Sequence, residues 1–407
     1  MKQRALLAGV LALLFWVGNR AAFEGYFSDD DLDNLSWATV AGTWGFVEEL
    51  ASPRFSESNT RPVGALFYQA AGRAFGLDFG KYVACLFVLH GVNCGLLWWL
   101  ARKRGASETG AWAAVVLWGF HAGLLEAWWK PMYVFDLLCG MACLGTWLLF
   151  ASRKTAWAVV CFLLAYRAKE VAIFLPVALA LDDWRRSWPF FLVSANFGLQ
   201  AMWANAGRDN NYTLRFRWES LVVTVPHYAR ALVMQPWAAV VGLATLATGK
   251  EALLGTAAML VPLVFLPGRM FEVYWYVPML PLALGAAHAL GRVPRHGLVL
   301  GLLLWVGLSY TRLKEKRNVE LAIAAENRAY VEQLATLWTL TKFPTRVSCE
   351  GAPPGLQAHG VRGALRLISG DLQAEVLPQA EPGAAVLRWF RPRQALSVSV
   401  APPEEKP

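Results

Sequence analysis

The stretch YVACLFVLHGVNCGLLWWLA, residues 82–101, decides the fold class of this chain. It contains no Asp, Glu, Lys or Arg, and it ends directly at Arg102-Lys103-Arg104. An α-helix needs about 20 apolar residues to cross the hydrocarbon core of a bilayer. A run of basic residues at one end is typical of the cytoplasmic end of such a helix. The stretch therefore predicts a transmembrane helix that ends in the cytoplasm.

The composition extends this prediction to most of the chain. Of the 407 residues, 56% are hydrophobic and only 16% are charged, whereas a soluble domain usually has about 25% charged residues. The net charge of +9 comes from short basic clusters between apolar runs. This pattern indicates membrane anchoring and argues against nucleic acid as a partner. The six cysteines show no CxxC pair or Cys/His spacing, so neither a disulfide framework nor a metal site is indicated.

About eleven spans are expected. They cover residues 5–17, 82–101, 110–128, 132–150, 156–166, 171–181, 189–204, 229–248, 252–266, 273–290 and 298–310. Residues 5–17 also resemble a signal peptide, but no clean A-x-A site follows and many spans do, which favours a retained helix. The short runs 156–166 and 171–181 are interpreted as a hairpin, since one unbroken helix would bury Lys169 and Glu170 near the midplane. A single long helix with snorkelling side chains is the alternative.

The basic loops predict the orientation of the chain. They place the N-terminus in the cytoplasm, residues 23–78 outside and, because the number of spans is odd, the C-terminus outside as well. Residues 1–312 are expected to form the transmembrane domain and residues 313–407 a helix followed by a β-rich domain. Alternating runs at 361–367 and 396–400 predict strands there. The expected fold class is an all-α polytopic membrane protein with a small outward-facing C-terminal α+β domain, most compatible with a bacterial inner membrane and a periplasmic C-terminus.

The stretch YFSDDDLDN, residues 26–34, is the strongest candidate for a site. Four carboxylates, those of Asp29, Asp30, Asp31 and Asp33, lie within five residues. Such carboxylates repel one another, which raises some of their pKa values. Such a cluster of carboxylates needs a partner. The partner is a cation, a metal ion or a hydroxyl group that one of the carboxylates deprotonates. A solvated acidic loop is the simpler alternative.

Further ionisable and aromatic residues lie at the expected outer ends of the spans. Arg61, Lys169 and Arg269 are candidate ligands of a phosphate. The candidate pocket residues are His121, Glu126, Asp136, Glu170, Glu272 and Tyr276. Polar contacts between helices, ion pairs that end helices and an interfacial aromatic belt are the alternatives for these residues. The orientation predicted from the basic loops nevertheless places all these carboxylates and cations on the outer side of the membrane, so they are expected to face the same compartment.

The order of these motifs resembles the GT-C superfamily of polyprenyl-phosphate-sugar-dependent glycosyltransferases. The resemblance covers roughly residues 5–300 and is nearest to protein O-mannosyltransferases and to transmembrane O-mannosyltransferases with tetratricopeptide repeats. Its motifs are Asp30-Asp31, Arg61-Pro62, His90-Gly91-Val92-Asn93, His121 with Glu126, Asp136-Leu137-Leu138, Lys169-Glu170 with Leu175-Pro176, and Tyr276-Val277-Pro278. The chain departs from these relatives in lacking the repeats and in the sequence Trp129-Lys130-Pro131-Met132, so the resemblance does not fix the donor or the acceptor.

The resemblance implies a GT-C-like fold and transfer of a sugar, with inversion, from a polyprenyl-phosphate donor to an acceptor hydroxyl on the extracytoplasmic side. Asp30 or Asp31 would be the catalytic base, with Asp29 extending the run. Arg61 and Lys169 would hold the donor phosphate by similarity, and Arg269 by its charge. The acceptor is a protein, a lipid or a glycan. A divalent cation is compatible with this chemistry, although no ligand spacing implies one.

Two other functions fit the same features. A transporter or flippase of a lipid-linked saccharide would also use intramembrane charges and broken helices, but no inverted repeat is present. A non-catalytic assembly subunit would bind its partner through the C-terminal domain.

Overall fold

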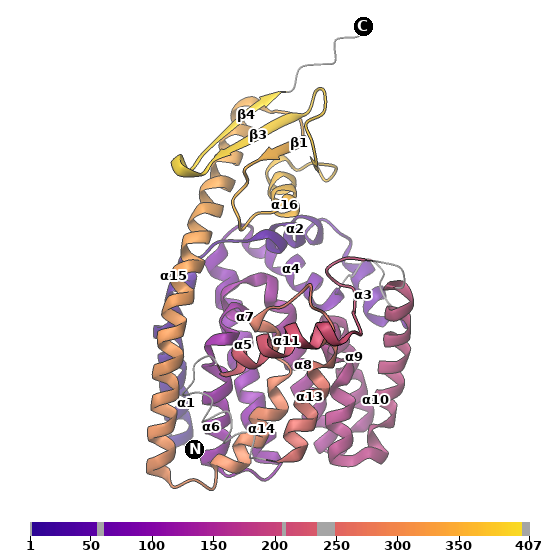
Figure 1. Cartoon of the computed structure of the whole chain (residues 1–407), viewed down its shortest axis with the longest axis vertical. Helices are drawn as coiled ribbons and strands as arrows, with labels where there is room; N and C mark the ends of the chain where they lie inside the picture. The colour runs from indigo at the N-terminus through magenta and orange to yellow at the C-terminus, as the bar shows by residue number, and fades with distance from the viewer. Residues whose placement is uncertain (1, 55–60, 206–208, 234–248, 401–407) are drawn as a thin grey trace.

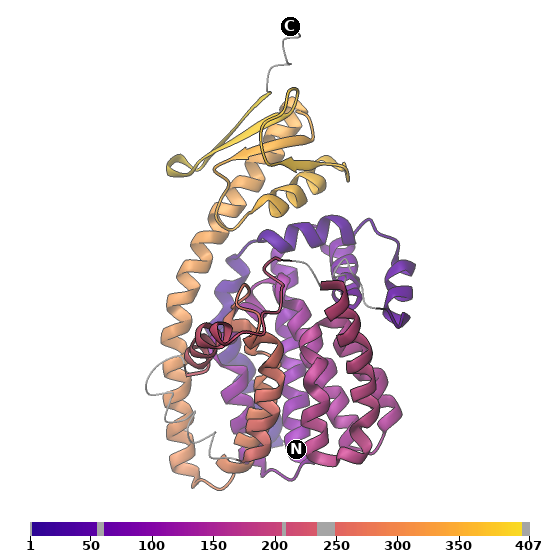
Figure 2. The ribbon, with the colours of Figure 1, turned by 45° about the vertical axis from the view of Figure 1, so that its right-hand side comes forward.

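A computed structural model shows a bundle of helices and a separate small α/β domain, joined by one long helix (Figure 1). The structure describes residues 2–54, 61–205, 209–233 and 249–400. Helix α15, Arg295–Thr341, runs along one side of the bundle and carries the C-terminal domain at its far end, as two views agree (Figure 2).

The bundle is almost entirely helical. Its α-helices are α1 Lys2–Asn19, α2 Asp29–Ala38, α3 Thr43–Ala51, α4 Pro62–Phe75, α5 Phe79–Lys103, α6 Glu108–Gly119, α7 Glu126–Trp129, α8 Val134–Ala151, α9 Thr155–Ala168, α10 Leu175–Asn205, α11 Trp218–Val233, α13 Lys250–Val264 and α14 Met279–Leu290. Short 3₁₀ helices η1 to η5 connect some of them, at Arg20–Glu24, Ala122–Leu124, Pro131–Tyr133, Glu170–Phe174 and Glu272–Trp275.

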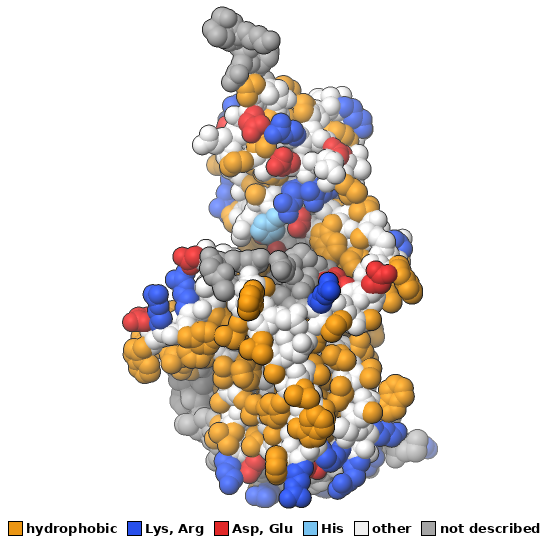
Figure 3. Space-filling model, turned by 90° about the vertical axis from the view of Figure 1, so that its right-hand side faces the viewer, with side chains coloured by type: hydrophobic (Ala, Val, Ile, Leu, Met, Phe, Trp, Pro, Cys, Tyr) orange, Lys and Arg blue, Asp and Glu red, His pale blue; other side chains and the backbone are white. Residues whose placement is uncertain are grey.

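The bundle has the surface of a membrane protein. Among the described residues, four helical segments are long and apolar enough to cross a membrane: Lys2–Glu24, Phe79–Lys103, Pro131–Ala151 and Arg295–Thr341. Helices α9 and α14 are apolar but shorter. Large apolar side chains are exposed around the bundle, among them those of Leu13, Val88, Trp99, Trp157, Trp188, Leu199 and Leu303. Lys and Arg side chains gather along the end of the bundle away from the C-terminal domain (Figure 3).

The expected hairpin between residues 156 and 181 is present. Helix α9 ends at Ala168, the chain turns through η4, and α10 begins at Leu175. Lys169 and Glu170 therefore lie at a tip rather than inside a continuous helix. Helix α10 continues through a break at Asp183, where the backbone is not helical (φ −158°, ψ 92°), and so joins two of the expected spans.

Two boundaries differ from those predicted. The span expected at 110–128 ends as α-helix at Gly119 and continues as η2 and α7. The reason is that the side chain of His121 accepts a hydrogen bond from the N–H of Gly123 and starts a tighter turn.

The span expected at 298–310 does not stop at residue 310. Helix α15 is continuous from its N-cap, Pro294, to its C-cap, Lys342, since no proline occurs inside it. At 1.5 Å per residue it is about 70 Å long, roughly twice the hydrocarbon thickness. Residues 234–248, which make up most of the span expected at 229–248, lie outside the described part of the chain.

The C-terminal domain is α+β, as predicted, but one predicted strand is a helix. Its sheet has the order β2-β1-β3-β4, with β1 Arg346–Glu350 parallel to β2 Glu375–Leu377 and to β3 Ala385–Phe390, and β3 antiparallel to β4 Ala395–Val400. Residues 361–367, expected as a strand, belong to α16, Ala358–Ser369. Val361, Ala364 and Leu365 are buried, and this i, i+3, i+4 spacing marks one helical face.

Helix α16 packs directly on α2 through two glycines. A Cβ atom at Gly360 would lie 2.8 Å from the Cα of Asp29, and one at Gly363 would overlap the backbone of Leu32 and Asp33. The two helices thus approach as closely as their backbones allow. An ion pair between Arg362 and Asp33, at 2.9 Å, closes the contact.

The Gly363→Val variant is therefore expected to displace α16 from α2. Forcing extra carbon atoms into a packed contact costs about 1–3 kcal/mol. We expect faster amide hydrogen exchange in α2, residues 29–38, in protein reconstituted in nanodiscs. Ala358→Val, at an exposed position of the same helix, is the matched control. Unchanged protection of α2 in Gly363→Val would contradict this packing.

Candidate active site

A cavity of about 470 Å³ lies at the end of the bundle that faces the C-terminal domain. Its lining comes from α2, from the start of α4, from the region around η3, from Lys169 just after α9, from η5 and from the loops that contain Tyr212 and Arg269. The lining residues are Asp30, Asp33, Asn34, Trp37, Arg61, Ala65, Met132, Tyr133, Phe135, Lys169, Tyr212, Arg269 and Tyr274. The cavity therefore brings together Asp30 and all three cations that the sequence singled out.

The three adjacent aspartates have three different environments at the start of α2. Asp31 is fully buried: its carboxylate accepts hydrogen bonds from the N–H and hydroxyl of Ser28, at 2.8 and 2.9 Å, and from the hydroxyl of Tyr68, at 3.0 Å. Burial raises the pKa of Asp31 to about 6. Asp31 forms a capping box that fixes the helix start, and it does not line the cavity.

Asp29 is also occupied elsewhere. Its Oδ1 atom accepts hydrogen bonds from the N–H groups of Gln357 and Gly360, both at 3.0 Å. These groups lie at the N-terminus of α16, where unpaired N–H groups and the helix dipole favour a carboxylate. Asp29 therefore joins the C-terminal domain to the bundle, and Asp30 is the only one of the three that reaches the cavity.

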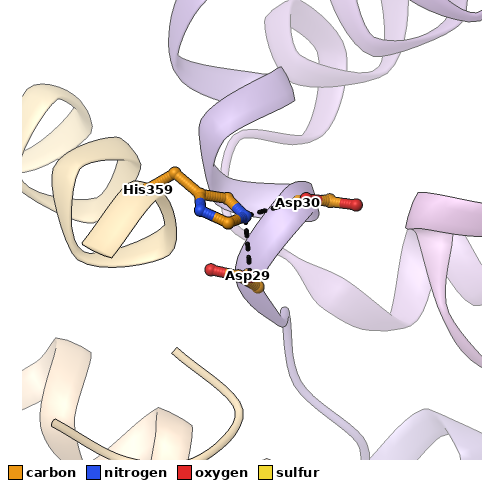
Figure 4. A group of neighbouring side chains, drawn as sticks. All are labelled: Asp29, Asp30 and His359. Atoms are coloured by element: carbon orange, nitrogen blue, oxygen red, sulfur yellow. Dashed lines mark hydrogen bonds and ion pairs between the residues drawn. The ribbon is translucent and has the colours of Figure 1, made fainter. Parts of the chain in front are cut away.

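Asp30 is held by a histidine from the C-terminal domain. The Nε2 atom of His359 lies 3.0 Å from Oδ1 of Asp30 and 2.7 Å from Oδ2 of Asp29 (Figure 4). The hydrogen bonds to Asp29 and Asp30 raise the pKa of His359 to about 10, and the hydrogen bond from His359 lowers the pKa of Asp30. At neutral pH the imidazole is protonated and Asp30 is an anion.

Two of the three cations in the cavity already have carboxylate partners. Arg61 makes a two-pronged ion pair with Glu170, at 3.0 and 2.9 Å. Lys169 binds both oxygens of the buried Asp136 at 2.7 Å. Both carboxylates, expected in the substrate pocket, therefore lie just behind the cations that line it.

Arg269 is different. Among the described residues, no carboxylate forms an ion pair with it. Its guanidinium lies 4.4 Å from the ring centre of Tyr212 and 5.2 Å from that of Phe271, and it is 3.3 Å from the hydroxyl of Tyr274. Arg269 thus contributes to the cavity a positive charge with which no carboxylate of the described residues pairs directly.

The other four residues expected around the substrate do not line the cavity either. His121 is buried and bonds the carbonyl of Leu232 at 3.0 Å. Glu126 pairs with Lys130, which also pairs with Glu320 of α15, and Glu272 pairs with Lys316 of α15. The hydroxyl of Tyr276 lies 2.9 Å from Nδ1 of His90 and 3.0 Å from Nδ2 of Asn93. These residues hold helices together instead.

Sequence reasoning missed His359 altogether. It lies 329 positions from Asp30, and no nearby motif marks it. Within the described residues, the carboxylate and imidazole atoms close enough together to accommodate a metal ion are those of Asp29, Asp30 and His359. Because these atoms already hydrogen-bond to one another, we interpret them as an ion-pair cluster.

The fold is that of an all-α polytopic membrane protein with a small α+β domain at one end of its bundle. Two of the solved structures that it resembles are those of ArnT from Cupriavidus metallidurans. The apo crystal structure matches with a TM-score of 0.59 and 14% sequence identity, covering 96% of this chain and 94% of ArnT. The structure of ArnT bound to undecaprenyl phosphate matches with a TM-score of 0.55 and 13% identity, over the same shares of the two chains. No protein-family model and no curated protein sequence matches the chain.

This likeness confirms the GT-C-like fold that the sequence predicted. It extends over the C-terminal domain as well as the bundle, since it covers nearly the whole chain.

Proposed function

We propose that this protein is a membrane glycosyltransferase that moves a sugar from a polyprenyl-phosphate donor to an acceptor hydroxyl. The observation that carries the proposal is the cavity in which the Asp30 carboxylate shares a lining with Arg61, Lys169 and Arg269. A base and a set of cations in one site are what transfer from a phosphate leaving group requires. The fold shared with ArnT, which has been crystallised with undecaprenyl phosphate, supports a lipid phosphate as the leaving group.

The balance of charge in the cavity favours an anionic ligand. Arg61 is neutralised by Glu170, and Lys169 by Asp136. Asp29 and Asp30 share the protonated His359. Arg269 has no direct carboxylate partner among the described residues, and a donor phosphate would supply one. Charges this close to low-dielectric surroundings interact more strongly than they do in water.

The chemistry follows from these positions. The carboxylate of Asp30 takes the proton of the acceptor hydroxyl as that oxygen attacks the anomeric carbon. The bond between the anomeric carbon and the phosphate oxygen breaks, and the polyprenyl phosphate leaves with the electron pair. Arg269, with Arg61 and Lys169 beside it, stabilises the negative charge that develops on the phosphate. Attack from the side opposite the leaving group inverts the anomeric configuration.

We further propose that transfer occurs on the extracytoplasmic side, in a bacterial inner membrane, with the N-terminus in the cytoplasm and the C-terminus in the periplasm. The basic loops support this orientation. Arg104, Asp182 and Arg186 lie at the end of the bundle where α5 ends and α10 breaks, and basic clusters mark the cytoplasmic ends of spans. The cavity is lined in part by α2 and the start of α4, which lie at the opposite end, beside the C-terminal domain (Figure 1).

The proposal is tested with the purified protein in lipid nanodiscs. A panel of polyprenyl-phosphate sugars is supplied with a membrane extract as the source of acceptor, with and without divalent ions, and free polyprenyl phosphate is quantified. We expect at least one donor to release polyprenyl phosphate well above the protein-free background, with an inverted product. Passage of an intact lipid-linked saccharide across a vesicle membrane without release would identify a transporter. Absence of release from every donor would favour an assembly subunit.

A further inference from the structure

The C-terminal domain contributes a side chain to the cavity of the bundle. His359 is in the first turn of α16, and its Nε2 atom bonds Oδ1 of Asp30 at 3.0 Å. The same atom bonds Oδ2 of Asp29 at 2.7 Å. One imidazole therefore bridges two neighbouring carboxylates at the start of α2 (Figure 4).

The position of His359 is fixed by contacts between the backbone of its helix and α2. Asp29 accepts hydrogen bonds from the N–H groups of Gln357 and Gly360, which flank His359 in the chain. Gly360 and Gly363 bring the backbones of α16 and α2 together. Arg362 pairs with Asp33 on the next turn. The imidazole, with 37% of its side chain exposed, is thus held against α2 on one side.

The two oxygen atoms of the Asp30 carboxylate have different surroundings. Its Oδ1 atom accepts the hydrogen bond from His359. Among the described residues, none donates a hydrogen bond to its Oδ2 atom. Because Asp30 lines the cavity, its unengaged oxygen is the one available to an acceptor hydroxyl.

We propose that His359 is a positioning residue for Asp30: the C-terminal domain supplies the imidazolium that orients the carboxylate of the base toward the acceptor. This inference rests on the proposed function and deepens it. It assigns to the C-terminal domain a part in the reaction, beyond binding a partner. A domain that only docked on the bundle would not need to reach Asp30.

The charged and titratable groups that face Asp30 predict the direction of the effect. They are His359 from α16, Arg61 at the start of α4, Arg269 and Tyr212 from the loops, Tyr68 from α4, and Asp29 and Asp31 from α2 itself. Of these, His359 makes the hydrogen bond that lowers the pKa of Asp30 most. Its loss raises the pKa of Asp30, so a smaller fraction of Asp30 is ionised at a given acidic pH, and the acid limb of the rate profile moves to higher pH.

The test measures kcat/KM for transfer against pH in the His359→Ala, His359→Gln and Arg362→Gln variants. We expect the acid limb of His359→Ala to move up by about one pH unit, which corresponds to about a tenfold loss on that limb. Gln retains an N–H donor without the charge and should give a smaller shift. Arg362→Gln removes the ion pair with Asp33 between the same two helices but no hydrogen bond to Asp30, so its acid limb should move much less. Equal displacement in Arg362→Gln, or none in His359→Ala, would overturn the proposal.

A second measurement separates this proposal from the proposed function. Imidazole nitrogen shifts of ¹⁵N-histidine-labelled protein, with His359→Gln used for assignment, report the protonation of His359 without any turnover. We expect His359 to remain protonated at pH 8 in the wild type and to lose its proton at a lower pH in Asp30→Asn. An imidazole that titrates near 6.5 in the wild type would overturn the positioning role, whatever the activity. Absence of transfer together with a protonated His359 would instead place the failure in the proposed function.

Discussion

Asp30→Asn is expected to lower transfer by about 10²–10⁴-fold, the range that a positioned general base contributes. The substitution keeps the size of the side chain and removes its ability to take a proton from the acceptor hydroxyl. Asp30 is partly exposed to the cavity, so the folded protein should tolerate the change. The measurement compares release of polyprenyl phosphate by wild type and variant in nanodiscs, together with donor binding in the absence of acceptor. Binding of the donor should be retained.

Asp31→Asn is the matched comparison, because the two residues are adjacent and chemically identical. The Asp31 carboxylate is buried and accepts three hydrogen bonds. Disturbing such a network costs about 1–3 kcal/mol, so we expect a lower melting temperature for Asp31→Asn than for Asp30→Asn. Transfer by the folded fraction should fall far less. If Asp31→Asn abolished transfer at unchanged stability while Asp30→Asn remained active, Asp31 would be the base.

The sequence predicted the membrane bundle because hydrocarbon is a demanding solvent. A run such as residues 82–101 has few alternatives to a spanning helix, and the structure has α5 there. The break at Lys169 and Glu170 was also predictable, since two charges are costly in mid-membrane. The length of α15 was not predictable. The change from apolar to mixed sequence near Tyr310 was interpreted as the end of a span, whereas the helix continues through it.

The sequence also singled out the ionisable residues that could form a site, but it did not show which of them meet. The acidic run gave no means to distinguish Asp29, Asp30 and Asp31, since their roles depend on α16, on Ser28 and on Tyr68. Residues 361–367 alternate enough to suggest a strand. The buried spacing of Val361, Ala364 and Leu365, with Gly370 in a left-handed conformation after the helix, is the helical signal that outweighs it. Tyr276 was placed with the substrate because of its aromatic neighbours, whereas its hydroxyl bonds two buried residues.

Arg269→Gln is expected to lower kcat/KM for transfer by about 10²–10³-fold, the loss typical when a group that stabilises transition-state charge is removed. Arg269 is the cation in the described cavity lining that no carboxylate of the described residues pairs with. Its loss removes a positive charge that is free to pair with the donor phosphate. Since negative charge on the phosphate increases as the sugar leaves, kcat should fall more than donor affinity. Steady-state kinetics over a range of donor concentrations measures both.

Arg61 offers the matched comparison, because it lines the same cavity but is already paired. Arg61→Gln leaves the carboxylate of Glu170 without its partner, so it both removes a cation and uncovers an anion beside the phosphate. We expect a loss at least as large as in Arg269→Gln, and partial recovery in the double variant Arg61→Gln/Glu170→Gln, which restores neutrality. Arg269→Gln has no such carboxylate to neutralise, so adding Glu170→Gln to it should give little recovery. Equal recovery in both backgrounds would mean that the cavity responds only to its net charge, and Arg269 would have no specific contact with the leaving phosphate.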